Sequence, residues 1–160
     1  MKKLFIFVIV ALLTAMLAVG CSPAAKEEAE VSIDLEALQK KIQDADLFTD
    51  IFERITKESV LSSIMFLDAE SIETYLLYMG SGYTGEEYGL FKCVSAEAAE
   101  VLVEDLKTRV ESQKNIYADY APEAIPRLNN AIIRKQGSYV AFVVADKNAD
   151  ALKIVEEYFK

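Results

Sequence analysis

Two adjacent carboxylates, Glu86 and Glu87, follow a glycine-rich loop and could supply acid–base chemistry in this 160-residue chain. A glycoside hydrolase uses a pair of carboxyl groups, one as the acid and the other as a base or nucleophile. Because successive residues of a strand project to opposite faces, Glu86 and Glu87 cannot form such a pair with each other. A second carboxylate would have to come from elsewhere in the chain. The sequence therefore favours the polar start of a strand at these positions over a catalytic site.

Tyr83 and Tyr88 lie on either side of these carboxylates and are two of four tyrosines between residues 75 and 88. A tyrosine combines a large ring with a polar hydroxyl, and it is enriched on recognition surfaces. We therefore consider a surface for an envelope protein or a glycan, formed by Tyr83, Glu86, Glu87 and Tyr88. Cross-strand pairing of aromatic rings in a hairpin explains several of the tyrosines equally well.

The acidic segment from Asp146 to Asp150, with Glu157 eleven residues after Asp146, has some of the spacing of a calcium-binding loop. That loop requires glycine at its sixth position, where this chain has Ala151. Helix capping by Asp146 or Asn148 explains the same residues without a metal. The chain contains no histidine, which excludes Ser-His-Asp and Cys-His catalysis and removes the commonest zinc ligand. We predict no metal and no cofactor.

Cys21 has a chemistry of its own, because it directly follows Leu17-Ala18-Val19-Gly20. Before it come a basic start and an apolar run over residues 4–19, which is shorter than the roughly 20 residues that span a bilayer. The pattern resembles the lipobox of bacterial lipoproteins, in which the cysteine thiol receives a diacylglycerol and the chain is cut just before it. We therefore predict a signal peptide over residues 1–20, in preference to a plain secretory signal or a stop-transfer helix. The domain would then be held at the extracytoplasmic face of the cell membrane by lipid on Cys21.

The net charge of the chain is −9, and loss of residues 1–20 removes two lysines and makes it −11. A strongly acidic chain argues against a nucleic-acid partner, which would require a basic surface. It also argues against electrostatic attraction to anionic lipid, so the acyl chains would provide the anchoring. If Cys21 carries lipid, the second cysteine, Cys93, has no disulfide partner and is interpreted as a small buried hydrophobic residue.

Residues 22–30 are small or charged and predict a flexible tether, so that residues 21–33 would link the lipid to one domain over residues 34–160. Asp34 is a plausible N-cap for a helix that begins with Leu35 and continues at helical spacing. The apolar residues between Phe48 and Ile55 have the same spacing and predict a continuation of that helix or a short second one. The segment from Val60 to Leu67 is compatible with either a strand or a helix.

The remainder of the chain shows the order strand–strand–helix twice. Ser95 is expected to cap the longest helix. The pattern predicts an α+β domain with a single antiparallel or mixed sheet of about four strands, helices packed on one face, and an N-terminal helix preceding. The expected strands cover 76–79, 87–94, 131–135 and 139–145. The expected helices are a long one over about 96–117 and a closing one that starts within 146–148 and includes Phe159.

Three short motifs accompany these elements: -Ser-Gly-x-Thr-x-Glu-Glu- from Ser81 to Glu87, Tyr120-x-Pro122-Glu123, and a Lys135-x-Gly137-x-Tyr139-Val140 hairpin. Together with the lipobox and the acidic tether, they resemble a group of small lipoproteins of Gram-positive bacteria known as domain-of-unknown-function family 4358. The resemblance covers roughly residues 34–146 and implies an exported α+β domain. It implies no activity, ligand or catalytic residue.

The function that these observations favour is that of a non-enzymatic binding or interaction domain at the outer face of a membrane. The alternative is a carboxylate-dependent hydrolase of the cell envelope, which would require a pocket with two converging carboxylates. A structural or assembly role is a third possibility, and a large exposed apolar patch would indicate it.

Overall fold

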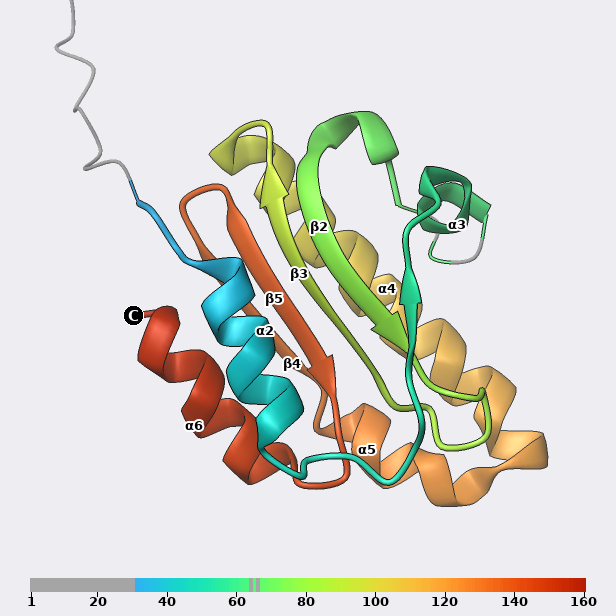
Figure 1. Ribbon diagram of the computed structural model, residues 1–160. Coiled ribbons are helices and arrows are strands. Elements are labelled where there is room, and N and C mark those ends of the chain that lie inside the picture. Colours follow the sequence, from blue (N-terminus) through green and yellow to red (C-terminus); the bar gives the residue numbers. More distant parts are fainter. Residues whose placement is uncertain (1–30, 64, 66) are drawn as a thin grey trace, which may run out of the picture.

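The structure is a computed structural model that describes residues 31–63, 65 and 67–160. Its centre is an open five-stranded sheet with the strand order β1-β2-β3-β5-β4, in which every neighbouring pair is antiparallel (Figure 1). The predicted α+β class with a single antiparallel sheet is therefore confirmed, with one strand more than expected. The strands are β1 (Glu53–Ile55), β2 (Ile72–Met79), β3 (Glu87–Cys93), β4 (Ile132–Gln136) and β5 (Tyr139–Val144).

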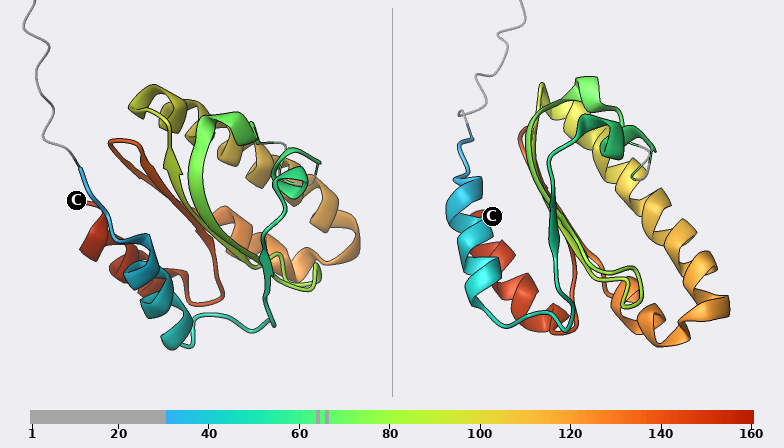
Figure 2. Two further views of the ribbon diagram at one scale, coloured as in Figure 1. Left: turned by 45° about the horizontal axis from the view of Figure 1, so that its top comes forward. Right: turned by 45° about the vertical axis from the view of Figure 1, so that its right-hand side comes forward.

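Helices cover both faces of the sheet, whereas one covered face was expected (Figure 2). One face carries α4, α5 and α3, and the other carries α2 and α6. Both faces require a cover because the central strands are apolar on both sides. The helices are α2 (Leu35–Asp44), α3 (Glu58–Ser63), α4 (Ala96–Tyr120), α5 (Ile125–Asn129) and α6 (Asn148–Tyr158), with short 3-10 turns η1 (Ala69–Ser71) and η2 (Pro122–Ala124).

Strand β5 joins the two hydrophobic cores, and all six of its residues are buried. Val140, Phe142 and Val144 pack into the core beneath α4. Ala141 and Val143 pack on the opposite face, beneath α2 and α6. A strand that is buried on both faces has a continuous apolar sequence, and β5 accordingly lies in the interior of the sheet, between β3 and β4.

The long helix α4 begins where the sequence predicts. Ser95 caps it, with Oγ accepting the N–H of Ala98 at 3.1 Å. The helix continues to Tyr120, three residues beyond the predicted end, and stops before Pro122, because the residue preceding a proline disfavours helical angles. Its buried face is apolar except for one arginine, and consists of Ala99, Leu102, Leu106, Arg109, Val110 and Tyr117.

The prediction of helix between Phe48 and Ile55 is wrong. Helix α2 ends at Asp44, and the chain continues as a loop into the edge strand β1. Phe48 and Phe52 are four residues apart, as in a helix, but each of their ring centroids lies 5.6 Å from that of Tyr88 on the sheet. Two residues of a loop that contact the same side chain of the sheet can thus be four positions apart, which is also the spacing of one face of a helix. In the following segment, α3 resolves the choice between strand and helix in favour of a helix.

The two strand–strand–helix units match in their strands and differ in their helices. Tyr88 and Tyr139 occupy the same face of the sheet, and Phe91 and Phe142 both occupy the other. If the two units were a repeat, a twofold axis would exchange β3 and β5. Because these strands are antiparallel neighbours, that axis would be perpendicular to the sheet, and the helices of both units would lie on the same face. Because α4 and α6 lie on opposite faces, the units are not a structural repeat.

The two ends of the sheet differ in what they carry. Val31, the first described residue, lies beside the β4–β5 turn, where a Cβ added at Gly137 would be 3.2 Å from the Cβ of Val31. The loops over 45–52, 80–86 and 145–147 and the α4–α5 connection lie at the opposite end, which we call the distal end (Figure 1). Within the described residues, no helix is long and apolar enough to cross a membrane. The predicted signal peptide and Cys21 lie outside the described residues.

Candidate functional site at the distal end

The β2–β3 loop, residues 80–86, is held against the 45–52 loop by Asp50. The carboxylate of Asp50 accepts the N–H of Ser81 at 2.9 Å, the Oγ–H of Ser81 at 2.8 Å and the Oγ1–H of Thr84 at 2.7 Å. Partial burial alone would raise the pKa of Asp50, but these hydrogen bonds and one from the N–H of Ile51 outweigh burial and lower the pKa. Ser81 and Thr84 in the -Ser-Gly-x-Thr-x-Glu-Glu- motif therefore serve to fix the loop.

Glu86 links three segments that are distant in the sequence, and its side chain is fully buried. One of its oxygens accepts the N–H groups of Thr49 at 2.9 Å and Asp50 at 2.8 Å. The other accepts the N–H of Asp146 at 3.0 Å and lies 3.7 Å from Nε of Arg127. Glu86 thus joins the 45–52 loop, the β5–α6 connection and α5 at one point, and we call these contacts the Glu86 network.

Glycines complete the loop because they allow positive φ angles. Gly82 has φ +89° and Gly85 has φ +71°, values that other residues rarely adopt. The carbonyl of Gly82 accepts the hydroxyls of Tyr117 at 2.9 Å and Tyr120 at 2.6 Å, and the two tyrosine rings stack with centroids 5.1 Å apart. Burial raises the pKa of Tyr117, so its hydroxyl is a neutral donor. The end of α4 therefore fixes the tip of the loop.

Glu87 is held separately, by a buried ion pair with Arg109 of α4. The contacts are bidentate, with Nε of Arg109 at 2.9 Å from one carboxylate oxygen and Nη2 at 2.7 Å from the other. The two side chains are only 5% and 6% exposed. Glu86 and Glu87 therefore have different partners and do not form a pair, as the sequence indicates.

Of the four residues predicted to form an interaction surface, the structure exposes one. Tyr83 is 72% exposed, whereas Glu86, Glu87 and Tyr88 are buried at 2%, 5% and 1%. Tyr88 pairs with Tyr78 across strands β2 and β3, and their rings stack at 4.7 Å. The alternative explanation, cross-strand aromatic pairing, therefore holds for Tyr88. A surface available to a partner cannot be formed by these four residues together.

Other exposed apolar side chains accompany Tyr83 at the distal end. Ile51 is 87% exposed and follows Asp50 in the chain, which binds the loop directly. Tyr120 is 53% exposed and donates its hydroxyl to the loop, and Ile116, 51% exposed, lies one turn earlier on α4. We call these four residues, Ile51, Tyr83, Ile116 and Tyr120, the distal surface. No periodicity in the sequence marks Ile51 or Ile116 as exposed, so their exposure is evident only from the structure.

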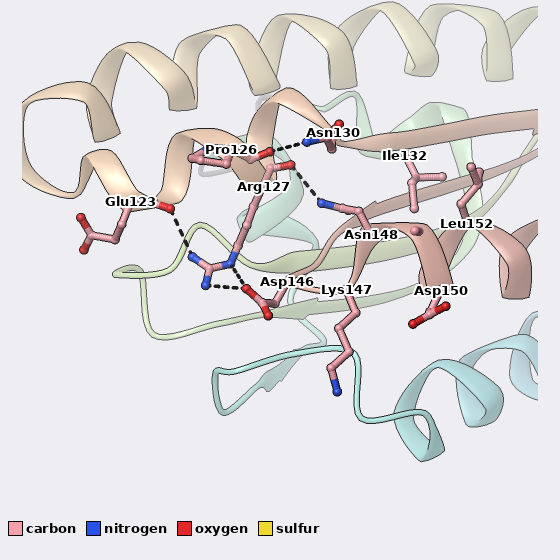
Figure 3. Close-up of a pocket in the computed structure, with 11 residues that line it drawn as sticks. Glu123, Pro126, Arg127, Asn130, Ile132, Asp146, Lys147, Asn148, Asp150 and Leu152 are labelled. Carbon is pink, nitrogen blue, oxygen red and sulfur yellow. Dashed lines mark hydrogen bonds and ion pairs between the residues drawn. The ribbon is translucent and has the colours of Figure 1, made fainter.

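A groove of about 700 Å³ lies next to this surface, between α5 and the start of α6 (Figure 3). Arg127 is its main cation, and the guanidinium donates from Nε at 3.1 Å and from Nη2 at 2.8 Å to a carboxylate oxygen of Asp146. Nη1 of Arg127 also reaches the carbonyl of Glu123 at 3.5 Å. The strongest charges in the groove are thus already paired. Its lining comprises Glu123, Pro126, Arg127, Asn130, Ile132, Asp146, Lys147, Asn148, Ala149, Asp150 and Leu152.

The predicted capping of α6 by Asp146 or Asn148 is wrong. The N-cap position is Lys147, without a side-chain hydrogen bond. Asp146 instead pairs with Arg127, and the side-chain oxygen of Asn148 lies 3.3 Å from the N–H of Ala145. Within the part of the chain that the structure describes, no three histidine, cysteine, aspartate or glutamate residues are arranged to hold a metal.

Comparison with known proteins places the chain in a family without giving it an activity. No curated protein and no solved structure matches it significantly. Residues 53–145 match the sequence profile of a family described as "Domain of unknown function (DUF4358)". The match includes the whole sheet and α4, and it leaves out α2 and α6. Since more than half of the chain is covered, the protein belongs to the DUF4358 family, as its motifs indicate.

Proposed function

We propose that this protein is a lipoprotein anchored through Cys21 at the extracytoplasmic face of the cell membrane, and that its domain binds another component of the envelope without catalysing a reaction. The Leu17–Cys21 segment supports the anchor. The binding role depends chiefly on one observation, the exposed distal surface of Ile51, Tyr83 and their two neighbours. The tether enters at Val31, at the other end of the sheet, so an anchored domain would direct this surface away from the membrane.

The distal surface has the properties of a recognition surface. Aromatic residues contribute strongly to the centres of protein interfaces because they bury a large area with few rotatable bonds. The loop beneath Tyr83 is fixed by Asp50, Glu86 and the hydroxyl of Tyr120, so little conformational entropy would be lost when a partner binds. A rigid apolar surface is therefore already formed in the isolated domain.

The contacts of Glu86 and Glu87 argue against the alternative, a hydrolase that acts through these carboxylates. Such an enzyme needs one carboxyl group that gives a proton to the substrate and a second that faces the reacting carbon or a water. Glu86 and Glu87 are both buried and accept hydrogen bonds from groups of the protein itself. Neither carboxylate lines the groove of Figure 3, and neither is free to act on a substrate there. We therefore favour a binding role over a hydrolase.

The anchor is tested by growing cells with a labelled fatty acid and isolating the protein. The wild type should carry the label, and Cys21→Ser should lose it and remain uncleaved before residue 21. Cys93→Ser is the matched control, since Cys93 is buried in the domain, and it should be labelled normally. Normal labelling of the Cys21→Ser protein would refute the anchor.

The binding role is tested by quantitative pulldown from an envelope extract with Ile51→Ser/Tyr83→Ser and the wild type. The amount of a genuine partner recovered with this variant should be lower than with the wild type by a factor of roughly ten or more. The reason is that central interface residues commonly contribute about 2 kcal/mol or more to the binding free energy. Val94→Ser/Val101→Ser is a matched control, since these side chains are 60% and 59% exposed and lie towards the tethered end of the domain. If both variants recover the same proteins as the wild type, the distal surface is not the binding site.

A further inference from the structure

The C-terminal end of α4, which lies beside the β2–β3 loop, carries negative charge from two sources (Figure 1). Asp119 is in the last turn of the helix, and that turn contains no basic residue. The carbonyl groups at the end of a helix carry partial negative charge, so a carboxylate there is unfavourable for the helix itself. Pro122 has no N–H group to give to the carbonyl of Ala118. The end of α4 therefore adds its own partial charge to that of Asp119.

Asp119 and Glu123 have no basic partner in the part of the chain that the structure describes. Both are exposed, and neither forms an ion pair there. By contrast, Glu104 and Glu111 of the same helix each pair with a lysine at 2.7 Å. In Figure 3 the carboxylate of Glu123 points away from Arg127, whose guanidinium reaches only the carbonyl of that residue. The charges of Asp119 and Glu123 are thus available to a partner.

The segments that carry the distal surface contain no lysine or arginine. These segments are residues 45–52, 80–86 and 115–124, and they include five carboxylates. Arg127 and Lys147 lie at the same end of the domain, but each is paired with an aspartate. An apolar surface with an acidic border favours a positively charged partner over a neutral or an anionic one.

Tyr120 presents an aromatic face next to these carboxylates. Its ring stacks on that of Tyr117 with centroids 5.1 Å apart, and its hydroxyl donates to the carbonyl of Gly82. Tyr117 is 5% exposed and Tyr120 is 53% exposed, so the accessible area of the pair belongs mainly to Tyr120. The face of an aromatic ring attracts cations, and the planar guanidinium group of arginine also stacks on it. Because Asp119 and Glu123 flank Tyr120 in the chain, a segment with several basic residues can cover the ring and meet the carboxylates.

We propose that the partner of the distal surface is a protein with an arginine-rich segment, which stacks a guanidinium group on Tyr120 and pairs with Asp119 and Glu123. This inference rests on the proposed binding role and names the chemistry of the partner. The same charges disfavour a second copy of this chain, because a symmetric pair would bring two acidic borders together. They also disfavour anionic lipids and anionic polymers. Binding of a neutral glycan would not depend on the two carboxylates.

The first test uses a fluorescent peptide probe, Gly-Arg-Leu-Arg-Tyr-Arg-Gly, and the same peptide with citrulline in place of each arginine. Citrulline has nearly the same shape as arginine without the charge. The purified protein should bind the arginine peptide saturably and the citrulline peptide roughly tenfold or more weakly. Asp119→Asn/Glu123→Gln should weaken binding of the arginine peptide roughly two- to thirtyfold, because two exposed ion pairs are lost. Tyr120→Leu should weaken it roughly two- to fivefold, because the aromatic face is lost.

Glu104→Gln/Glu111→Gln is the matched control, because it removes the same charge from the same helix at carboxylates that already have lysine partners. This control should bind the arginine peptide like the wild type. Asp119→Asn alone should leave the unfolding midpoint unchanged or raise it, because it removes a carboxylate from the end of a helix. The proposal would be overturned by equal binding of the two peptides, by no saturable binding of either, or by equal losses in the two double variants.

The pulldown that tests the binding role separates a failure of this proposal from a failure of that role. If Ile51→Ser/Tyr83→Ser loses an envelope component and Asp119→Asn/Glu123→Gln keeps it, the distal surface binds a partner without using these charges. Only the arginine-binding proposal then fails. If neither variant changes what is recovered, the binding role fails, and the arginine-binding proposal fails with it. Loss of the same protein from both variants, together with preferential binding of the arginine peptide, would support both.

Discussion

Replacing Glu86 with glutamine should lower the free energy of unfolding by about 3 kcal/mol. One carboxylate oxygen accepts the N–H of Asp146 and lies near Arg127, and the other accepts the N–H groups of Thr49 and Asp50. Glutamine has one oxygen and one NH₂ group, so in either orientation the NH₂ group faces backbone donors. The orientation that costs less places the NH₂ group towards Asp146. It leaves the N–H of Asp146 unpaired, which costs about 1–3 kcal/mol, and it weakens the contact with the charged Arg127, which contributes about 1.5–3 kcal/mol. Since the Asp146 N–H is only partly buried, we take the lower part of both ranges.

The measurement is urea unfolding followed by circular dichroism, with Glu70→Gln as the matched control. Glu70 is exposed at the start of a 3-10 turn, so the same chemical change there should alter stability by no more than about 0.5 kcal/mol. The slope of the transition should stay the same, because the folded structure and the area exposed on unfolding are unchanged. A loss within about 0.5 kcal/mol for Glu86→Gln as well would show that the Glu86 network does not hold the distal end together.

Three further predictions follow from other contacts. Arg109→Met should cost about 3–5 kcal/mol because it leaves the carboxylate of Glu87 buried without its ion-pair partner. The double variant with Glu87→Gln should recover part of that loss in urea unfolding, and no recovery would mean that charge is not the cause. Gly89→Ala should cost about 1–3 kcal/mol, since its Cβ would lie 2.4 Å from a ring carbon of Phe91. In a double-mutant cycle, Phe91→Leu should reduce this cost, and strictly additive losses would contradict the proposed clash. The pKa of Asp50 is lowered in the folded state, so the unfolded state binds more protons between the folded value and about 4, and stability falls as the pH drops through that interval. Thermal unfolding below pH 4 should therefore show a smaller acid-dependent loss for Asp50→Asn than for the wild type, and equal losses would contradict this assignment.

The parts of the fold that the sequence predicts are those determined by neighbouring residues. Ser95 caps α4 through the N–H of a residue three positions away, so the start of the helix is a local property. The run from Tyr139 to Val144 is apolar at every position, which is typical of a strand between two layers. The buried thiol of Cys93 also agrees with its apolar surroundings in the sequence.

The parts that the sequence does not predict depend on distant residues. Phe48 and Phe52 have helical spacing, but they contact Tyr88, which lies far along the chain on β3. Glu86 looks like the polar start of a strand, and its donors are 37 residues before it, at Thr49, and 60 residues after it, at Asp146. These donors meet at one point only when the sheet is formed, so the burial of Glu86 could not be predicted from local patterns. The same holds for the burial of Tyr88, which removes it from the predicted interaction surface.

The position of β5 has a consequence for the order in which the protein folds. This strand is the last of the described strands in chain order, yet it lies between β3 and β4, and β4 has no other neighbour among them. A growing chain therefore cannot complete the sheet, or either of the two hydrophobic cores, until residues 139–144 are available. Such long-range pairing makes folding slow. If the protein is exported as we propose, a chain in which β5 is still missing would remain in an open form that can pass through a narrow secretion channel.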